Sequence, residues 1–146
     1  MSTNLGWMSA YLHTQTRRIV MSEVDVAQIH FTTFLRWMDR GLSEWLAEVG
    51  YPFTRLLAEG PGIPIVDSQC SFLARVHLDD LITLQTGVKD IGRTSFRSGH
   101  RFFRGDELVG EGTLVHVCVD RVSRATLPVP EWLRTVAHAS WPPPAP

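Results

Sequence analysis

Helical periodicity is clearest between Phe31 and Val49, where apolar residues recur three and four positions apart. At about 100° per residue, the large apolar side chains fall within an arc of roughly 120°, the width of a helix side that faces a core. Gly50 is suited to end such a helix, and Pro52 prevents its continuation. The apolar side consists of Phe31, Phe34, Leu35, Met38, Leu42, Trp45, Leu46 and Val49. The pattern predicts one long amphipathic helix.

The other patterned segments predict β-strands. They mix β-branched and aromatic residues or alternate between apolar and polar ones, and Arg104-Gly105-Asp106 is a hairpin turn signal between the last two. Short connections between successive strands indicate antiparallel pairing, so we expect the last four strands to form a meander. The expected strands are Tyr11–Met21, Val66–Ala74, Ile82–Lys89, Thr94–Phe103 and Leu108–Val119.

This order of elements predicts an α+β fold in which one helix packs on a curved antiparallel sheet of about five strands. Long edge strands tend to pair with further strands, so we expect a homo-oligomer. A short helix is expected over Glu131–Ala139, after Pro130. We expect a single domain over residues 1–140 and an extended proline-rich tail over residues 141–146.

Composition narrows the class of protein. The 146 residues carry a formal net charge of −1, with 44% hydrophobic and 20% charged residues, which is typical of a folded domain without a strongly basic surface. No apolar run reaches the roughly 20 residues of a membrane span, and the first residues do not resemble a secretory signal. Cys70 and Cys118 lack the spacing of a disulfide framework. We expect a cytoplasmic protein that binds neither nucleic acid nor a membrane.

Candidate chemistry lies just before the long helix, where Glu23 and Asp25 precede its first turn. Such a carboxylate can cap the helix and interact favourably with its dipole. Alternatively, the free amides of the first turn can bind a carbonyl oxygen that gains negative charge, while the carboxylate attacks the carbonyl or removes a proton from water. The spacing alone leaves both interpretations open.

Seven segments carry a further signal. They are Asp25-Val-Ala-Gln-Ile-His-Phe, Phe34-Leu-Arg-Trp-Met-Asp39, Glu44-Trp-Leu-Ala-Glu-Val-Gly50, Leu78-Asp-Asp-Leu81, Gly92-Arg-Thr-Ser-Phe96, Glu107-Leu-Val-Gly-Glu-Gly-Thr-Leu-Val-His-Val-Cys-Val-Asp120 and Leu127-Pro-Val-Pro-Glu-Trp-Leu133. In this order and spacing they resemble the hot-dog-fold acyl-CoA thioesterases of the 4-hydroxybenzoyl-CoA thioesterase type, over about residues 11–137. The resemblance implies a hot-dog fold, a dimer or tetramer, and hydrolysis of a small, medium or aryl acyl-CoA thioester to the free acid and CoA.

The resemblance also implies roles for particular residues. Asp25 matches the catalytic carboxylate, acting as nucleophile or general base, and must face the same space as the helix start. The Phe31 N–H would polarise the thioester carbonyl, with His30 and Thr33 as supporting polar groups. The expected substrate-binding residues are Thr32, Trp37, Arg93, Thr94 and Ser95. No metal is implied, and no cofactor other than the CoA of the substrate.

Three departures from the family pattern keep alternatives open. The segment from Asp25 to Phe31 is one residue shorter than usual, Gln28 stands where glycine is common, and Thr33 stands near a common asparagine. Glu23 therefore competes with Asp25 for the active role. A non-catalytic module that binds acyl thioesters and a thioesterase acting on an acyl carrier protein are the alternatives. Elsewhere, His116 shares a strand face with Cys118, which is more typical of sheet packing than of a metal pair.

Overall fold

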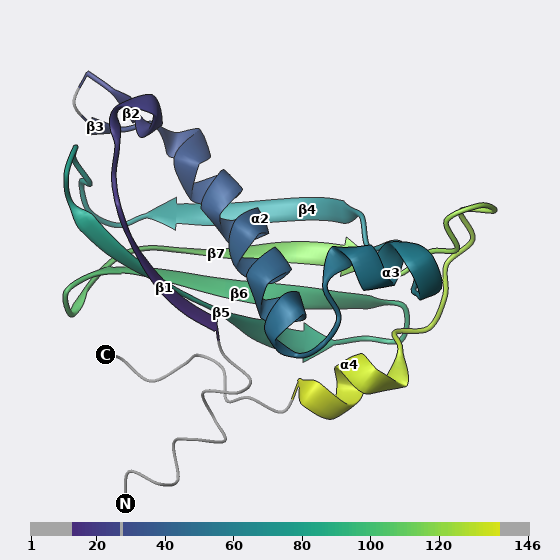
Figure 1. Ribbon diagram of the computed structural model, residues 1–146. Helices are drawn as coiled ribbons and strands as arrows, with labels where there is room; N and C mark the ends of the chain where they lie inside the picture. The colour runs from purple at the N-terminus through teal and green to yellow at the C-terminus, as the bar shows by residue number, and fades with distance from the viewer. Residues whose placement is uncertain (1–12, 27, 138–146) are drawn as a thin grey trace, which may run out of the picture.

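The computed structural model describes residues 13–26 and 28–137. A long helix, α2 (Phe31–Glu48), lies across one face of a five-stranded antiparallel sheet (Figure 1). The strands are β1 (His13–Arg18), β4 (Ile65–Phe72), β5 (Leu81–Ile91), β6 (Ser95–Arg104) and β7 (Glu107–Val117), in the spatial order β1-β5-β6-β7-β4. The expected α+β architecture, with one long helix on a curved sheet of five strands, is confirmed.

The expected four-strand meander is wrong for its first strand. β5, β6 and β7 do pair in succession, but β4 pairs with β7, where Ser68 lies opposite Leu114. Residues 73–80 connect β4 to β5, and this connection is long enough to cross the intervening strands. Leu73 N and Ala74 N donate to Val109 O along the way. Alternation along a strand identifies the strand, but not its neighbour in the sheet.

Shorter elements surround the sheet and the long helix. A 3₁₀ turn, η2 (Met21–Glu23), and two short strands, β2 (Val24–Asp25) and β3 (Gln28–Ile29), precede α2, while α3 (Phe53–Glu59) follows it. The predicted first strand therefore ends before its expected limit of Met21, and its first two residues lie outside the described residues. The final helix, α4 (Glu131–Val136), forms as expected. The end of its expected range and the tail over residues 141–146 also lie outside the described residues.

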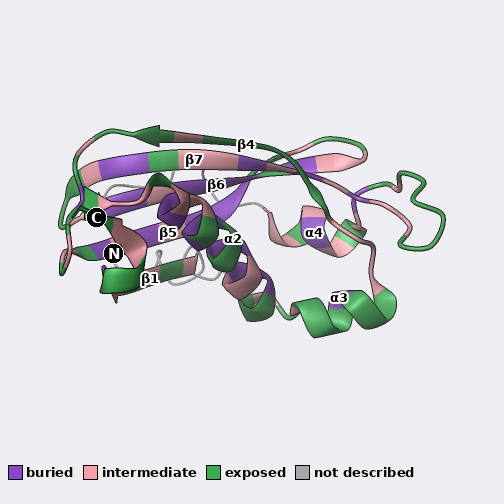
Figure 2. Ribbon diagram, turned by 90° about the horizontal axis from the view of Figure 1, so that it is seen from above, coloured by how far each residue is buried: buried purple, intermediate pink, exposed green. Residues whose placement is uncertain are grey.

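The core lies between α2 and the sheet, where buried residues follow the inner face of the strands (Figure 2). Small residues set how closely the two layers approach. A Cβ at Gly41 of α2 would collide with the Thr86 hydroxyl, and one at Gly112 of β7 would lie 2.6 Å from Met38 Sδ. The buried side chains of α2 are Thr33, Phe34, Trp37, Met38, Leu42, Trp45 and Leu46. They include most of the predicted apolar side, whereas the Phe31 side chain is 57% exposed.

β4 is an edge strand with little cover on either face. Seven of its eight residues are exposed, and Cys70 is half-buried. Figure 2 shows both this strand and α3 as mostly exposed. Apolar side chains lie at both ends of the strand: Ile65 is 44% exposed at its start and Phe72 is 51% exposed at its end. The β4 backbone therefore has a free edge at which a further strand could pair.

Candidate active site at the start of the long helix

A small hairpin leads the chain into α2. β2 pairs with β3, so that Val24 lies opposite Ile29 and Asp25 lies opposite Gln28. The hairpin is fixed to the β4–β5 connection, because Ile29 N donates to Val76 O at 2.8 Å. The helix start is held to η2 by a bond of 2.8 Å from His30 N to the carbonyl oxygen of Glu23. These bonds place the hairpin beside the first turn of α2 (Figure 1).

His30 is the N-cap residue of α2. Its Nδ1 accepts a hydrogen bond of 3.2 Å from Thr32 N and lies 2.7 Å from the Thr32 hydroxyl. Because Nδ1 acts as an acceptor, a neutral His30 ring carries its proton on Nε2. The ring also stacks on Phe31, with centroids 4.9 Å apart. The side chains of His30 and Thr32 thus come together in a capping arrangement at the helix start, and neither residue lines a cavity there.

The backbone amide of Phe31 is the first of the helix, and among the described residues no acceptor pairs with it. The first N–H groups of a helix lack intrahelical partners and carry a partial positive charge. An amide in this position can therefore donate to a carbonyl oxygen, and its donation strengthens as negative charge develops on that oxygen.

A mostly apolar groove of about 390 Å³ is lined in part by Phe31. We call it the helix-start groove. Its walls come from three parts of the chain: β3, the first turn of α2, and the end of β4 with the connection that follows. The lining residues are Gln28, Ile29, Phe31, Phe34, Phe72, Leu73, Ala74, Arg75 and Val76. Its size and apolar lining suit a small or medium acyl group.

Among the groove residues, the sequence pattern predicts only Phe31 as part of the site. The segment from Phe72 to Val76 enters the groove because the connection from β4 to β5 crosses the intervening strands, and this path is not visible in the periodicity of the chain. Gln28 departs from the family pattern, which gives it no predicted role in the site. The available signal was local: Phe72-Leu73-Ala74 is an apolar run at the end of a polar strand.

The two competing carboxylates differ in their partners. Glu23 Oε1 accepts from Val20 N at 2.9 Å, and its Oε2 accepts from Trp37 Nε1 at 2.8 Å. Asp25 is exposed, and its carboxylate makes no hydrogen bond or ion pair with any other described residue. Asp25 does not line the helix-start groove, although Gln28, opposite it in the hairpin, does. Within one chain, Glu23 holds the loop together, while Asp25 is free beside the groove.

Thr33 and Trp37 lie in the interior instead of the groove. The Thr33 hydroxyl donates to the carbonyl oxygen of Glu23 at 3.0 Å, which ties the first turn of α2 to the preceding loop. Trp37 is 5% exposed and packs against Phe102 in the core, with its indole N–H on Glu23. In this structure both residues support the loop that carries Asp25.

Arg93, Thr94 and Ser95 lie far from the helix start, at the turn between β5 and β6. Arg93 O accepts from Val129 N, and Thr94 O accepts from Cys118 N, so this turn lies against the segment that leads to α4. β5 has eleven residues and spans about 30 Å at the usual rise per residue. The turn is at the end of β5 opposite to the connection that lines the groove. One chain therefore does not bring these three residues to His30 and Phe31.

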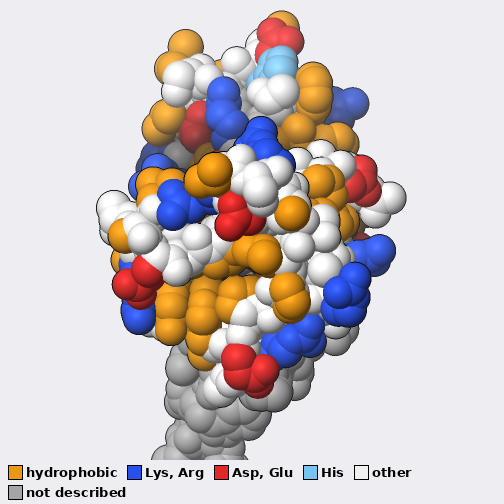
Figure 3. All heavy atoms as spheres, turned by 90° about the vertical axis from the view of Figure 1, so that its right-hand side faces the viewer, with side chains coloured by type: hydrophobic (Ala, Val, Ile, Leu, Met, Phe, Trp, Pro, Cys, Tyr) orange, Lys and Arg blue, Asp and Glu red, His pale blue; other side chains and the backbone are white. Residues whose placement is uncertain are grey.

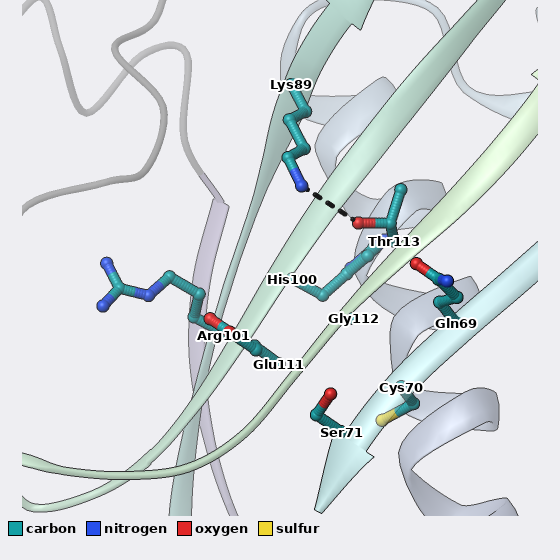
Figure 4. Close-up of a pocket in the computed structure, with 9 residues that line it drawn as sticks. All are labelled: Gln69, Cys70, Ser71, Lys89, His100, Arg101, Glu111, Gly112 and Thr113. Atoms are coloured by element: carbon teal, nitrogen blue, oxygen red, sulfur yellow. Dashed lines mark hydrogen bonds between the residues drawn. The ribbon is translucent and has the colours of Figure 1, made fainter.

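A second cavity, of about 380 Å³, lies on the face of the sheet away from α2 (Figure 4). Its lining is polar, and Lys89 Nζ donates to Thr113 Oγ1 at 3.3 Å across it. The lining residues are Gln69, Cys70, Ser71, Lys89, His100, Arg101, Glu111, Gly112 and Thr113. The sheet separates this cavity from the helix-start groove, so the two do not form one site.

Within the part of the chain that the structure describes, no group of three or more His, Cys, Asp or Glu side chains is arranged to hold a metal ion. None of the helices over residues 13–26 and 28–137 has the length and apolar character needed to cross a membrane.

A long helix on an antiparallel sheet, with its first residue lining an apolar groove, defines the hot-dog class of thioesterase folds, and solved structures confirm the fold. A 1,4-dihydroxy-2-naphthoyl-CoA thioesterase from Synechocystis matches with a TM-score of 0.78 at 18% identity, over 86% of this chain and 95% of the other. The 4-hydroxybenzoyl-CoA thioesterase from Pseudomonas sp. strain CBS-3 matches with a TM-score of 0.76 at 23% identity, over 86% and 99%.

The chain belongs to the Thioesterase-like superfamily, whose family model matches residues 4–136. Among curated relatives, a 1,4-dihydroxy-2-naphthoyl-CoA hydrolase from Prochlorococcus marinus (strain MIT 9515) is 27% identical over 131 residues, covering 85% of this chain and 87% of the relative. The Pseudomonas 4-hydroxybenzoyl-CoA thioesterase is 32% identical over 95 residues, covering 62% and 67%. The predicted resemblance and the predicted enzyme class, thioester hydrolase, are confirmed.

Proposed function

We propose that this protein hydrolyses an acyl-CoA thioester with a small, medium or aryl acyl group. The observation that carries the proposal is the unpaired backbone amide of Phe31, a residue that lines the helix-start groove, together with the free Asp25 carboxylate on the adjacent hairpin. The names of the relatives support the substrate class, since they act on aromatic acyl-CoA thioesters.

In the proposed reaction the acyl group occupies the helix-start groove, and the thioester carbonyl oxygen accepts a hydrogen bond from the Phe31 N–H. Asp25 then has two possible roles. As a nucleophile it attacks the carbonyl carbon and expels the CoA thiolate, leaving an acyl–aspartyl anhydride that water hydrolyses. As a general base it removes a proton from water as that water attacks the same carbon. In both routes the Phe31 amide stabilises the oxyanion of the tetrahedral intermediate.

Thiol release from a panel of short, long and aryl acyl-CoA substrates tests this function directly. We expect release above the uncatalysed rate for at least one small or aryl substrate. The same acyl group presented on an acyl carrier protein gives the comparison that identifies the preferred carrier. Saturable binding of acyl-CoA without thiol release would contradict the proposal and indicate a non-catalytic binding module.

We further infer that the protein is a homodimer, alone or within a homotetramer, formed by antiparallel pairing of β4 with β4 of a second copy. The free edge of β4 supports this pairing, as do the apolar side chains at its two ends. Figure 3, viewed from the α3 side, shows hydrophobic side chains gathered among charged ones. In Figure 1, α3 lies toward the end of the sheet at which β4 begins, and its Leu57 side chain is 60% exposed.

Antiparallel pairing would bring the start of β4 in one copy to the end of β4 in the other, where Phe72 and Leu73 line the helix-start groove. The partner would then cover the groove and exclude water from Asp25. A heterodimer of one Asp25→Asn chain and one Leu57→Glu chain tests this arrangement. Because each complete site would take Asp25 from one chain and Leu57 from the other, the heterodimer should show about half of the wild-type rate per dimer.

Two controls accompany this test. Each parent homodimer should be nearly inactive, and Val122→Glu, at a position that is 93% exposed, should keep full activity. If both parent homodimers are inactive and the heterodimer forms but is also inactive, the two chains do not share sites. That result would not contradict the proposed hydrolysis. An active Asp25→Asn homodimer would contradict the catalytic role of Asp25 instead.

A further inference from the structure

Four polar side chains are buried on the inner face of the sheet, away from the helix-start groove. They are Thr86 of β5, Ser98 and His100 of β6, and His116 of β7, and none is more than 1% exposed. The proposed reaction does not involve them. We refer to these four residues as the buried histidine chain.

Consecutive hydrogen bonds join the four side chains. Thr86 Oγ1 lies 3.1 Å from His100 Nδ1, and His100 Nε2 lies 2.9 Å from Ser98 Oγ. Ser98 Oγ lies 3.1 Å from His116 Nε2, and His116 Nδ1 lies 3.4 Å from the carbonyl oxygen of Ile63. The chain thus connects three adjacent strands to the segment that precedes β4.

The carbonyl at one end fixes the direction of every bond. Ile63 O can only accept, so His116 Nδ1 carries a hydrogen and the Nε2 of the neutral ring accepts from Ser98. Because the Ser98 hydroxyl donates its hydrogen to His116 Nε2, its oxygen accepts the hydrogen bond from His100 Nε2–H. His100 Nδ1 is then an acceptor for the Thr86 hydroxyl. The two rings therefore hold opposite tautomers, with the hydrogen on Nε2 in His100 and on Nδ1 in His116.

Within residues 13–26 and 28–137, no carboxylate makes a hydrogen bond or ion pair with the buried histidine chain. Glu111 and Lys89 line the polar cavity together with His100, but by strand alternation the Glu111 side chain projects from the opposite face of the sheet. From α2, Gly41 approaches Thr86. From β1, His13 lies opposite Thr86, and the two carboxylates that reach this region, Glu44 and Glu48, pair with His13. The remaining titratable neighbours bring no anion: they are Cys118 after β7, Arg134 of α4, which acts on Cys118, and Cys70 of β4, opposite Gly112. Burial raises the pKa of both thiols to about 11.

We propose that the buried histidine chain is an acid-sensitive latch that joins β5, β6, β7 and the segment that precedes β4 only while both rings are neutral. A proton on His116 would place two N–H donors on Ser98 and leave the Ser98 hydrogen without an acceptor. A proton on His100 Nδ1 would likewise leave the Thr86 hydroxyl hydrogen without its acceptor. Either event buries an unpaired charge and an unsatisfied hydroxyl, and both destabilise the folded state.

The direction of the pH dependence follows from the two pKa values. Burial, and to a lesser extent the neighbouring His116, lowers the pKa of His100 from its ordinary 6.5 to about 3, and burial lowers that of His116 to about 4. The unfolded chain therefore binds more protons than the folded one below pH 6.5. The unfolding equilibrium constant should be independent of these groups above pH 6.5 and should rise as the pH falls, approaching tenfold per pH unit for each histidine.

The double variant His100→Gln/His116→Gln tests the latch, because an amide can donate and accept but does not titrate here. The unfolding equilibrium constant is measured by denaturant titration from pH 7 to pH 4.5. The two histidines should make this constant rise in the wild type by up to about 100-fold per pH unit, and the double variant should lack that contribution. His77→Gln, on an exposed histidine, should keep the wild-type slope. Equal slopes in the double variant and the wild type would overturn the proposal.

Ring ¹⁵N spectra of the unaltered protein supply a test that does not depend on how the variants fold. At pH 7 we expect the Nε2–H tautomer for one buried ring and the Nδ1–H tautomer for the other, assigned to His100 and His116. Both should stay neutral until the protein unfolds. The same tautomer in both rings, or a buried ring that titrates near its ordinary pKa in the folded protein, would overturn the latch.

Discussion

The start of α2 and the buried histidine chain differ in how many of their polar groups are hydrogen-bonded. At the helix start, His30 caps the helix beside an open groove, while the Phe31 amide and the Asp25 carboxylate find no partner among the described residues. In the buried histidine chain, both nitrogens of His100 and His116 have a partner. Hydrogen-bonding groups at the helix start have no partner within the described residues, whereas each ring nitrogen in the buried histidine chain has one.

The difference separates a site from a scaffold. A polar group left unpaired at the surface is solvated at little cost, and its interactions strengthen when a substrate or a second chain removes the water. A buried polar group stabilises the fold only while each of its partners is present. A single substitution should therefore affect mainly the reaction in the first region and mainly the folding equilibrium in the second.

The largest expected effect is at the open region. Asp25→Asn keeps the size of the side chain but removes the nucleophile or base, so thiol release should fall by about 10³-fold. The unfolding midpoint should not move, because the Asp25 carboxylate makes no bond within the described residues. Asp39→Asn, an exposed position on α2, is the matched control and should retain activity. Hydrolysis at the wild-type rate by Asp25→Asn would remove Asp25 from the mechanism.

In the buried histidine chain the corresponding substitution is Ser98→Ala. It removes the acceptor of His100 Nε2–H and the donor to His116 Nε2 together, so the free energy of unfolding should fall by about 3 kcal/mol. Activity per folded molecule should stay near wild type, because the groove is on another part of the sheet. Denaturant titration beside thiol release checks both statements. A loss of activity with unchanged stability would mean that the two regions are coupled.

Glu23→Gln distinguishes the two carboxylates near the helix start. An amide can accept from either Val20 N or Trp37 Nε1 through its oxygen, but its nitrogen then faces the other donor. We expect the free energy of unfolding to fall by about 2 kcal/mol, with activity kept within an order of magnitude. Comparison with Asp25→Asn on the same assay decides the assignment. A larger loss of turnover in Glu23→Gln would make Glu23 the reacting group.

Local features of the sequence predicted much of the fold and part of the site. The helix and the strands follow from apolar spacing, and His30, Phe31 and Thr32 lie together because one helix boundary contains them all. The place of β4 beside β7 was not predictable from alternation, because it depends on which strands the connection over residues 73–80 crosses. For the same reason, the residues of this connection that line the groove could not be predicted.

The same limit explains the other differences. Arg93 to Ser95 match a family pattern in sequence, yet the length of β5 carries them to the far end of the sheet. Ser98 and His100 share a strand face by simple alternation, whereas His116 joins them through the register of β6 and β7, in which Phe96 lies opposite His116. Pairing register and crossover are properties of the whole sheet, and no local pattern specifies them.

The smallest effect is expected at the tip of the hairpin that carries Asp25. Val26 has φ = 53° and is 93% exposed, a left-handed conformation that is unfavourable for a β-branched residue. Asn adopts this conformation more readily, so Val26→Asn should raise the free energy of unfolding by about 1 kcal/mol. If the strain orients Asp25, turnover should fall while stability rises. If the conformation of Val26 does not orient Asp25, the free energy of unfolding should rise in Val26→Asn while turnover is unchanged. A decrease in the free energy of unfolding would show that Val26 is not strained.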